Sequence, residues 1–181
     1  MVELKNAFGS VKHELLIHSL RIAHIPNSII KYIENFYNSI RVCNKTDSFI
    51  TKCIDLKIGV FQGDTLSPAL FLMVINPILK WIQHSAHHGY YFRDRPIITL
   101  AFADYLTLCL ENKRTAQRQL LEVDNATKSV GLTLKPKTCK SLSFYSGKLS
   151  DASFKLQDEI IENINNGQVS WHPDLQSKSE K

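Results

Sequence analysis

The stretch that most limits how this chain can fold is residues 97–110, in which Asp104 is the only charged residue. Its side chains are mostly aliphatic, β-branched or aromatic, which favours strands over loops. The stretch is longer than an ordinary strand, and Asp104 and Tyr105 interrupt its apolar run. These features predict a β-hairpin with Asp104 and Tyr105 at its tip.

Apolar residues at helical spacing predict four helices around this hairpin. The expected helices cover residues 12–24, 27–40, 66–86 and 113–130, and Pro77 is expected to kink the third. Hairpins and crossover helices in this order predict an α+β fold, in which an antiparallel sheet is packed with helices. Further strands are expected at residues 41–45, 51–58, 89–92, 132–135 and 141–145.

The length of 181 residues fits one domain with one substantial core. Residues 1–147 carry the patterned helices and strands, and we expect them to form that domain. Residues 148–181 are polar and poorly patterned, so we expect a partly disordered C-terminal extension there.

The first residues lack the apolar block of a secretion signal, and no stretch approaches the roughly 18 uncharged apolar residues of a membrane span. We therefore expect an intracellular protein of the nucleus or cytoplasm, which is not secreted and does not contact a membrane.

The four cysteines lie far apart and form no C-x-x-C pair, which argues against a zinc site. In an intracellular protein they are expected to be reduced. We predict that all four are small buried apolar side chains. They are Cys43, Cys53, Cys109 and Cys139.

The net charge of +5 is concentrated in residues 113–148, which carry eight basic and two acidic residues and therefore +6. Such a basic segment attracts polyanions, including nucleic acids. A solvated helix face gives the same pattern, and both interpretations stay open. The basic residues are Lys113, Arg114, Arg118, Lys128, Lys135, Lys137, Lys140 and Lys148.

Four segments together carry the pattern of a known family. They are VELKNAFGSV at residues 2–11, GVFQGDTLSP at 59–68, AFADYL at 101–106 and GLTLKPKTCKSLS at 131–143. In this order and spacing they resemble the polymerase palm of reverse transcriptases, most closely those of non-LTR retrotransposons. The resemblance implies a palm-like antiparallel sheet with a ferredoxin-like core. It also implies a truncated, degenerate palm, in which fingers and thumb are absent.

The resemblance implies two-metal chemistry, in which a strand aspartate and an aspartate pair at a hairpin tip hold two Mg²⁺ ions. These catalytic positions fall on Glu3, Asp104 and Tyr105 in this sequence. Glu3 is one methylene longer than aspartate, and Tyr105 replaces a carboxylate by a phenol. A weakened metal site is therefore expected on Glu3 and Asp104, with the two acids side by side on neighbouring strands.

The resemblance also implies a nucleotide-binding surface. Phe8 matches the aromatic residue beneath the incoming sugar, although a core phenylalanine fits the position equally well. Gln62 and Gly63 match the loop that contacts the incoming nucleotide and the template base, and a plain strand-to-helix connection is the alternative. A lysine that aids pyrophosphate departure is assigned to Lys137, with Lys140 as the other choice.

By resemblance, the partners are an RNA or DNA template-primer and nucleoside triphosphates, and the reaction is RNA-directed DNA polymerisation. The altered metal ligands and the missing subdomains predict that this chain is catalytically impaired or inactive. Two other hypotheses are a non-catalytic remnant that binds nucleic acid or protein, and a relic with no selected role.

Overall fold

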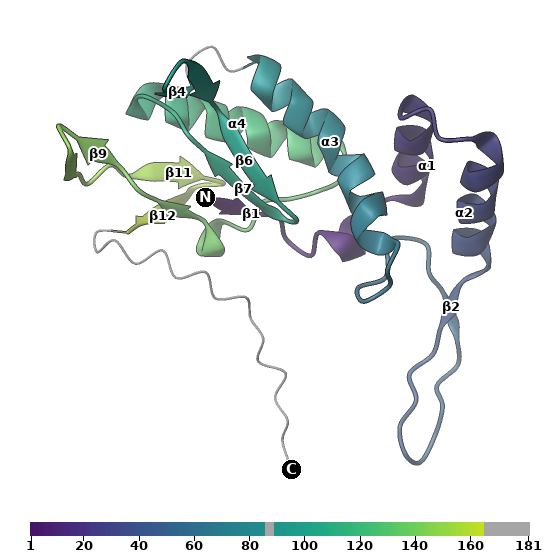
Figure 1. Ribbon diagram of the computed structural model, residues 1–181. Coiled ribbons are helices and arrows are strands. Elements are labelled where there is room, and N and C mark those ends of the chain that lie inside the picture. Colours follow the sequence, from purple (N-terminus) through teal and green to yellow (C-terminus); the bar gives the residue numbers. More distant parts are fainter. Residues whose placement is uncertain (86–88, 165–181) are drawn as a thin grey trace.

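The computed structural model describes residues 1–85 and 89–164 and has a mixed α+β fold (Figure 1). The helices are α1 (His13–Ile22), α2 (Asn27–Ser39), α3 (Ser67–Ser85) and α4 (Lys113–Ser129). They confirm the four predicted helices, and Pro77 lies inside α3. None of the helices in the described residues is long and apolar enough to cross a membrane.

A three-stranded antiparallel sheet forms the centre of the fold. Its order is β1 (Val2–Glu3), β7 (Tyr105–Leu108) and β6 (Thr99–Phe102). Strands β6 and β7 form the hairpin predicted from their apolar run. Because Phe102 pairs with Tyr105, the two-residue loop is Ala103 and Asp104, and Tyr105 is already the first residue of β7. The predicted tip was therefore wrong by one residue.

Strand β1 is paired on both sides although it is only two residues long. Glu3 lies opposite Tyr105 of β7. On the other side, Leu4 pairs with Leu134, and backbone hydrogen bonds of 2.7 and 2.9 Å flank this pair. The strand predicted at residues 132–135 is present as this short pairing, so β1 lies in the interior of the sheet.

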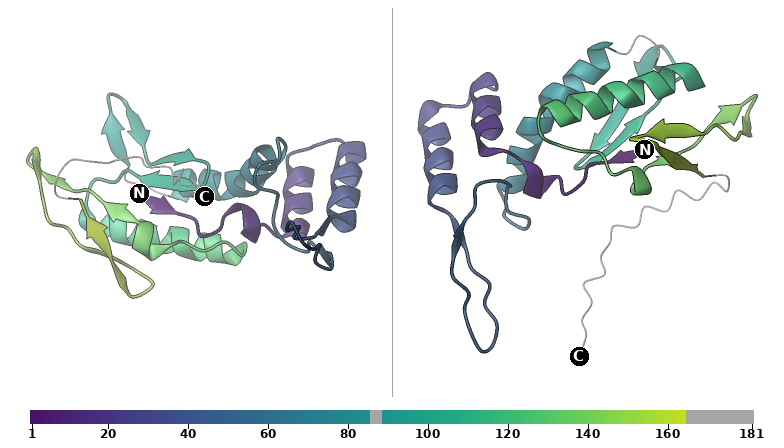
Figure 2. Two further views of the ribbon diagram at one scale, coloured as in Figure 1. Left: turned by 90° about the horizontal axis from the view of Figure 1, so that it is seen from below. Right: turned by 180° about the vertical axis from the view of Figure 1, so that it is seen from behind.

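Alternation along these strands sends one set of side chains toward the helices. Helices α3 and α4 lie across that face of the sheet (Figures 1 and 2), and their apolar side chains complete the core. The opposite face carries Glu3 and Tyr105. The inward set is at most 3% exposed and consists of Val2, Leu4, Leu106, Leu132 and Leu134.

Three two-stranded hairpins lie outside the central sheet. They are β2 (Arg41–Val42) with β3 (Ile54–Asp55), β4 (Tyr90–Phe92) with β5 (Arg95–Ile97), and β9 (Phe144–Tyr145) with β10 (Lys148–Leu149). Strand β5 was not predicted, because a strand that begins with arginine and proline has no strand signature until its partner is known.

The C-terminal strands pack into the same core. Strand β12 (Glu159–Asn163) is antiparallel to β11 (Phe154–Leu156) and parallel to β8 (Lys140–Ser141). The central sheet is antiparallel as expected, whereas this separate three-stranded sheet contains one parallel pair. Leu156 and Ile161 are buried, so the boundary expected at residue 147 has packed strands on both sides. Residues 165–181 of the expected extension lie outside the described residues.

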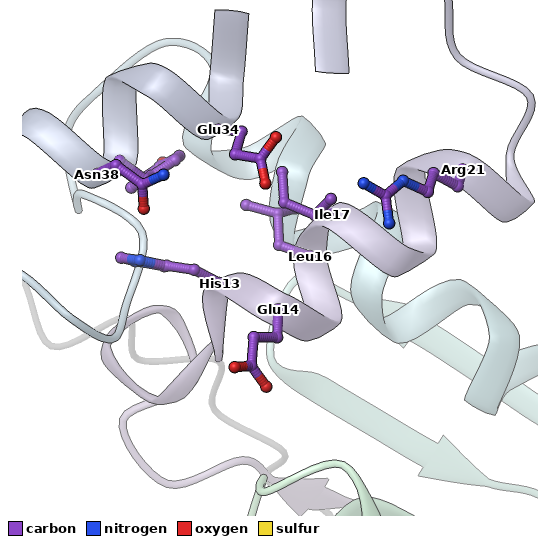
Figure 3. A pocket seen from close by; sticks show the side chains of 8 residues that line it. His13, Glu14, Leu16, Ile17, Arg21, Glu34 and Asn38 are labelled. Carbon is purple, nitrogen blue, oxygen red and sulfur yellow. The ribbon is translucent and has the colours of Figure 1, made fainter. Parts of the chain in front are cut away.

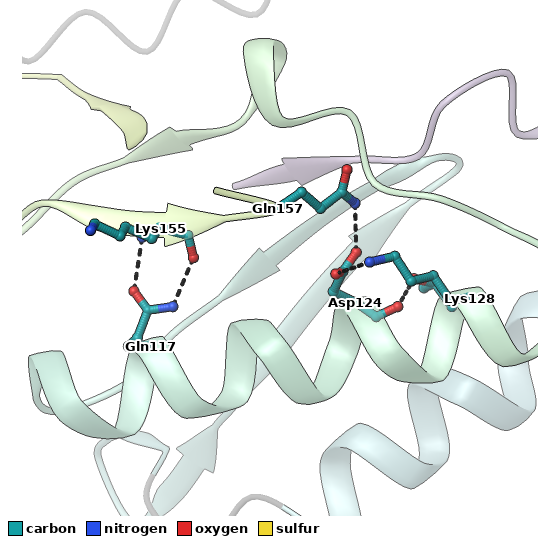
Figure 4. Close-up of polar contacts among 6 residues, drawn as sticks. Gln117, Asp124, Lys128, Lys155 and Gln157 are labelled. Carbon is teal, nitrogen blue, oxygen red and sulfur yellow. Dashed lines mark hydrogen bonds and ion pairs between the residues drawn. The ribbon is translucent and has the colours of Figure 1, made fainter. Parts of the chain in front are cut away.

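Side chains of α4 fasten this C-terminal hairpin to the helix (Figure 4). Gln117 Nε2 donates to the Lys155 carbonyl oxygen at 2.8 Å, and Gln117 Oε1 accepts from the Lys155 amide at 2.9 Å. The buried Asp124 accepts hydrogen bonds from Gln157 Nε2 at 2.8 Å and from Lys128 Nζ at 2.6 Å. Strand β11 is the edge of its sheet, so Gln117 satisfies backbone groups that an edge leaves unpaired.

Helices α1 and α2 pack together at one end of the molecule, and the β2–β3 hairpin projects from them (Figures 1 and 2). A disulfide joins Cys43 and Cys53 across this hairpin. The prediction that all four cysteines are reduced and buried is therefore wrong, because these two lie exposed on a ribbon with no covering layer. Cys139 is free and buried, and Cys109 is free and partly exposed.

The Gln117 contacts give a first prediction. Gln117→Ala should lower the free energy of unfolding by about 1 kcal/mol, because two hydrogen bonds to one backbone residue are lost. It should also speed hydrogen exchange of the Lys155 amide. Urea denaturation and native-state hydrogen exchange measure the two effects. Gln83→Ala, at an exposed position of α3, is the matched control and should change neither. An unchanged Lys155 exchange rate in Gln117→Ala would contradict the assigned contact.

Candidate functional site

Four side chains form a row across the outward face of the central sheet. Strand register puts Phe102 opposite Tyr105 and Tyr105 opposite Glu3. Lys135 completes the row, because its amide donates to the Glu3 carbonyl oxygen at 2.9 Å. Directly opposed residues on neighbouring strands point to the same face. The chain therefore holds an acid between a phenol and an ammonium group.

Asp104 lies at the end of this row, in the β6–β7 turn. It follows Ala103, whose φ of +51° is in the left-handed region. Such a conformation costs a non-glycine residue of order 1 kcal/mol, and strain of this kind collects at functional sites. The Asp104 carbonyl oxygen accepts from the Leu4 amide at 3.0 Å. This bond fixes the turn beside β1, so the structure brings Glu3 and Asp104 together.

The electrostatics of the site reflect this proximity. Partial burial is the main cause that raises the pKa of the Asp104 carboxyl, and a hydrogen bond from its own backbone opposes the shift. The Glu3 carboxylate raises this pKa further, whereas Lys135 lowers it. Two acids and one base thus share a small region of the surface.

Lys135 is the residue of this site that the sequence analysis missed. Its Nζ lies 3.6 Å from Glu3 Oε1, with the lysine side chain 45% exposed and the glutamate side chain 18% exposed. The sequence analysis counted it only in the basic segment. The sequence did contain an indication of this role. Alternation in the predicted strand at residues 132–135 places Thr133 and Lys135 on the face opposite the apolar Leu132 and Leu134.

The donor set does not fit a two-ion site. Glu3 and Asp104 supply carboxylate oxygens, which suit a hard divalent cation. Tyr105 supplies an uncharged phenol instead of a third carboxylate, and Lys135 brings a positive charge. In the part of the chain that the structure describes, no three His, Cys, Asp or Glu side chains gather where one ion could bind them.

Phe8 contacts both α3 and the loop that follows residue 58. Its ring stacks on Phe71 of α3, with centroids 4.9 Å apart and an interplanar angle of 20°. Its carbonyl oxygen accepts from the Val60 amide at 2.8 Å, and the Val11 carbonyl oxygen accepts from the Gly59 amide at 2.7 Å. Phe8 is only half-buried, so one part of the ring belongs to the core and another part is accessible.

His13 secures the same loop from α1. Its Nε2 donates to the Gly59 carbonyl oxygen at 2.9 Å, and its ring lies 4.7 Å from that of Tyr37. Burial raises the pKa of the Tyr37 hydroxyl. Figure 3 shows the adjoining cavity of about 230 Å³, with side chains of α1 and α2 around it, Glu14 and Glu34 among them. His13 does not stand out in the sequence, because it falls inside the helix expected at residues 12–24.

The loop itself is open to solvent. Gln62 and Gly63 are exposed. Gly63 has a φ of +100°, which glycine adopts without strain, and a Cβ built there would meet no atom within 4 Å. The loop ends where Ser67 Oγ donates to Asp64 Oδ2 at 3.2 Å at the start of α3. The structure therefore holds Gln62 and Gly63 between two fixed ends, with free space around them.

The remaining predicted site residue, Lys137, lies exposed in the 3-10 turn η2 (Pro136–Thr138). Its alternative, Lys140, forms an ion pair with Glu162. No contact joins Lys137 to Glu3 in the described residues, and the lysine beside the acid is Lys135.

Half of the predicted basic segment is neutralised by acids. Four of its eight basic side chains lie within 4 Å of a carboxylate, whereas the ion pairs of the described residues leave out Lys113, Arg114, Lys137 and Lys148. The paired residues are Arg118 with Glu122, Lys128 with Asp124, Lys135 with Glu3 and Lys140 with Glu162.

Several curated proteins are similar to this chain, and they are Pol polyproteins of R2 retrotransposable elements. The type-1 R2 protein of Nasonia vitripennis is 30% identical over 149 residues, which cover 82% of this chain and 14% of that protein. One from Popillia japonica is 28% identical over 146 residues, covering 78% and 23%. The type-2 R2DM protein of Drosophila melanogaster is 26% identical over 174 residues, covering 87% and 16%. This chain spans less than a quarter of the length of these relatives.

The family described as "Reverse transcriptase (RNA-dependent DNA polymerase)" matches residues 1–172. The match covers all four motif segments, the acidic row and the loop around Gly63. It confirms the resemblance found in the sequence. The chain therefore belongs to the reverse transcriptase family.

Proposed function

We propose that this chain is a reverse-transcriptase palm module with a reduced cation site, and that it does not by itself carry out template-directed nucleotidyl transfer. The observation that carries the proposal is the row of Tyr105, Glu3 and Lys135. In this row a phenol stands on one side of the acid and an ammonium group on the other, which leaves Asp104 as the second carboxylate.

The missing carboxylate at position 105 weakens cation binding more than the added lysine does. The Glu3–Lys135 pair is partly exposed, and such pairs contribute about 1 kcal/mol or less, so a divalent cation can displace the lysine at small cost. A lost carboxylate about 4 Å from an ion removes roughly 4 kcal/mol or more per unit charge at an effective dielectric constant of 20. Glu3 and Asp104 together are expected to hold one Mg²⁺ weakly.

The length of Glu3 adds a geometric deficit. Its extra methylene moves the carboxylate by about 1.5 Å relative to aspartate. Misplacement of about 1 Å in a catalytic group costs about 10²-fold in rate. The lost carboxylate at position 105 and the longer side chain at position 3 both favour a module that keeps the polymerase architecture but has a greatly reduced rate of nucleotidyl transfer.

The nucleotide-facing residues support a retained binding surface. Phe8 is braced by Phe71, and Gly63 has open space beside it. We assign Phe8 to the sugar, and Gln62 and Gly63 to the base and its template partner. We assign Lys137 to the phosphates of a nucleoside triphosphate, because it is exposed and outside the ion pairs of the described residues.

A second candidate function is non-catalytic binding of a template-primer. Its specific support is the outward face of the sheet, where Phe102 is 74% exposed and Leu100 is 57% exposed beside the row. Exposed aromatic side chains such as Phe102 are typical of surfaces on which unpaired bases stack. This function needs no complete metal site.

A prediction on metal binding follows. The chain should bind Mg²⁺ only weakly in calorimetric titrations, and Tyr105→Asp should bind it about tenfold more tightly or better, because a third carboxylate is restored. Thr107→Asp is the matched control, since it adds the same charge to β7 on the same face two residues away. It should change the affinity little. Equal gains from both variants would mean that net charge alone, rather than the site, attracts the ion.

The same variants should show no primer extension on an RNA template with Mg²⁺ or Mn²⁺. Extension by the unmodified chain that disappears in Asp104→Ala would overturn the proposal of a catalytically inactive module.

The raised pKa of Asp104 gives a prediction on stability. Because the carboxyl pKa in the folded state lies above its ordinary value of 3.8, ionisation of Asp104 disfavours folding. Asp104→Asn should therefore raise the melting temperature at pH 7 by about 1–2 °C. The gain should vanish as the pH falls through the raised pKa toward 3.8. Solvent screening of this half-exposed group keeps the gain below about 1 kcal/mol.

Thermal melts at about pH 7 and about pH 3 measure this difference. Asp94→Asn, at the matching place in the β4–β5 turn, is the control and should show no gain. A lower melting temperature for Asp104→Asn at pH 7 would contradict the cost of burying the Asp104 carboxylate, to which the nearby Glu3 adds.

Binding of nucleic acid should depend on the basic residues outside ion pairs. Lys113→Gln with Lys137→Gln should lower the slope of log affinity against log salt by about 1–2. Arg118→Gln with Lys140→Gln removes the same charge from ion-paired positions and should change the slope less. Titration of a labelled duplex between about 50 and 200 mM salt measures both. Equal losses would assign binding to net charge.

A further inference from the structure

The β4–β5 hairpin exposes three aromatic side chains in a row. Tyr90, Tyr91 and Phe92 are 56%, 58% and 57% exposed, although side chains of this size are usually covered. Arg93 and Arg95 follow directly in the sequence. The hairpin lies outside the acidic row and the nucleotide loop, and none of the roles proposed above uses it.

The pairing of the two strands sorts these residues by face. Tyr90 lies opposite Ile97, Tyr91 opposite Pro96 and Phe92 opposite Arg95. Tyr90 and Phe92 therefore share one face with Arg95, and Tyr91 points to the other face. The two rings on the shared face lie two residues apart, or about 6.5–7 Å along the strand.

Two arginines adjoin this aromatic face. The Arg93 guanidinium carbon lies 5.7 Å from the centroid of the Phe92 ring, within cation–π range. Neither arginine forms an ion pair with a carboxylate in the described residues. Asp94, in the turn between them, is the one acid of residues 90–97, which carry a net charge of +1.

The hairpin has a fixed position on the molecule. The Tyr90 amide donates to the Cys109 carbonyl oxygen at 3.1 Å, and Gly89 pairs with Leu110. These bonds attach β4 to the end of β7 that is remote from Asp104 (Figure 1). From Tyr105 to Cys109 the strand spans about 13 Å, so the aromatic face is separate from the acidic site.

We propose that the β4–β5 hairpin binds single-stranded nucleic acid by stacking unpaired bases on Tyr90 and Phe92, with Arg93 and Arg95 on the adjoining phosphates. Every base offers a flat face to an aromatic ring, so this contact requires no particular sequence. Guanidinium groups bind phosphate oxygens through paired hydrogen bonds. A duplex hides its base faces within the stack, so the hairpin should prefer single strands.

The charge on the hairpin favours this occupant over a protein. An apolar protein partner would have to bury two guanidinium groups without carboxylates to pair with them, which is unfavourable. A nucleic acid supplies the compensating phosphates at the same time as the bases.

The test uses the whole chain and a labelled oligothymidylate of about ten nucleotides, within the usual site size of such surfaces. Fluorescence anisotropy at about 200 mM salt suppresses the general electrostatic attraction. Tyr90→Ile with Phe92→Ile removes both rings and keeps apolar, β-branched side chains in the strand. This double variant should bind the single strand at least tenfold more weakly. Its affinity for a duplex of equal length should be unchanged.

The β9–β10 hairpin offers a matched control. Phe144 and Tyr145 are 64% and 78% exposed, and no arginine lies in that hairpin. Phe144→Ile with Tyr145→Ile should change single-strand binding less than about twofold if stacking occurs on β4–β5. The Mg²⁺ affinity of the Tyr90→Ile with Phe92→Ile variant should equal that of the unmodified chain, so that failure of the metal-site proposal and failure of this one are distinguishable.

A second variant tests the same surface without replacing the aromatic side chains by isoleucine. Arg93→Gln with Arg95→Gln changes exposed side chains only and should lower the salt slope of single-strand binding by about 1–2. Lys45→Gln with Lys52→Gln, in the β2–β3 hairpin, removes equal charge and should not. The proposal would be overturned if the ring variants of β4–β5 and of β9–β10 weakened single-strand binding equally. It would also be overturned if the unmodified chain bound single strand and duplex with equal affinity, or if neither β4–β5 variant lost affinity for the single strand. A β4–β5 surface that fails to bind the oligonucleotide but captures a protein would overturn it as well.

Discussion

Everything at the acidic site depends on backbone hydrogen bonds made by one very short strand. The Leu4 amide donates to Asp104 on one side of β1, and the Lys135 amide donates to Glu3 on the other. Since main-chain groups make these bonds, the identity of the side chains does not set their spacing. A different side chain at position 3 or 105 would therefore alter the chemistry of the site while the strands keep their register. The backbone pairing of the site is therefore independent of the side chains that it carries.

Local patterns in the sequence predicted where the helices and strands lie better than they predicted which strands pair with one another. Helical spacing and capping signals indicated all four helices, and the apolar run around Asp104 indicated the central hairpin. Motif order also indicated that Glu3 lies beside Asp104. Pairings that depend on residues far away in the sequence were missed, such as β12 beside β8 and the Cys43–Cys53 disulfide. Neither strand β5 nor strand β12 has a signature of its own, because its stability comes from the neighbour with which it pairs.

The same distinction applies to charge. A count along residues 113–148 gives +6, yet half of the basic side chains lie beside acids in the folded chain. Two of these acids, Glu3 and Glu162, lie outside the segment and cannot enter a local count. The effective field on nucleic acid thus comes from a few unpaired side chains, and a linear count overestimates it. Lys135 was for this reason counted only as a basic residue, since the carboxylate beside it, that of Glu3, is more than one hundred residues away in the sequence.

The β4–β5 and β6–β7 hairpins show that the sequence of a turn does not by itself determine what kind of site forms there. Residues 92–95 and residues 102–105 both follow the pattern Phe-x-Asp-x, and their second residues, Arg93 and Ala103, have φ values of +52° and +51°. The turns are therefore built alike and have similar backbone strain. They differ in what lies beside them, because residues 102–105 face the third strand of the central sheet, whereas β4 and β5 form a sheet of two strands. Only the turn next to β1 brings its aspartate against Glu3, and the other turn leaves its arginines and aromatic rings to solvent. The neighbouring strand, rather than the turn sequence, decides which hairpin becomes an acidic site and which becomes a surface for unpaired bases.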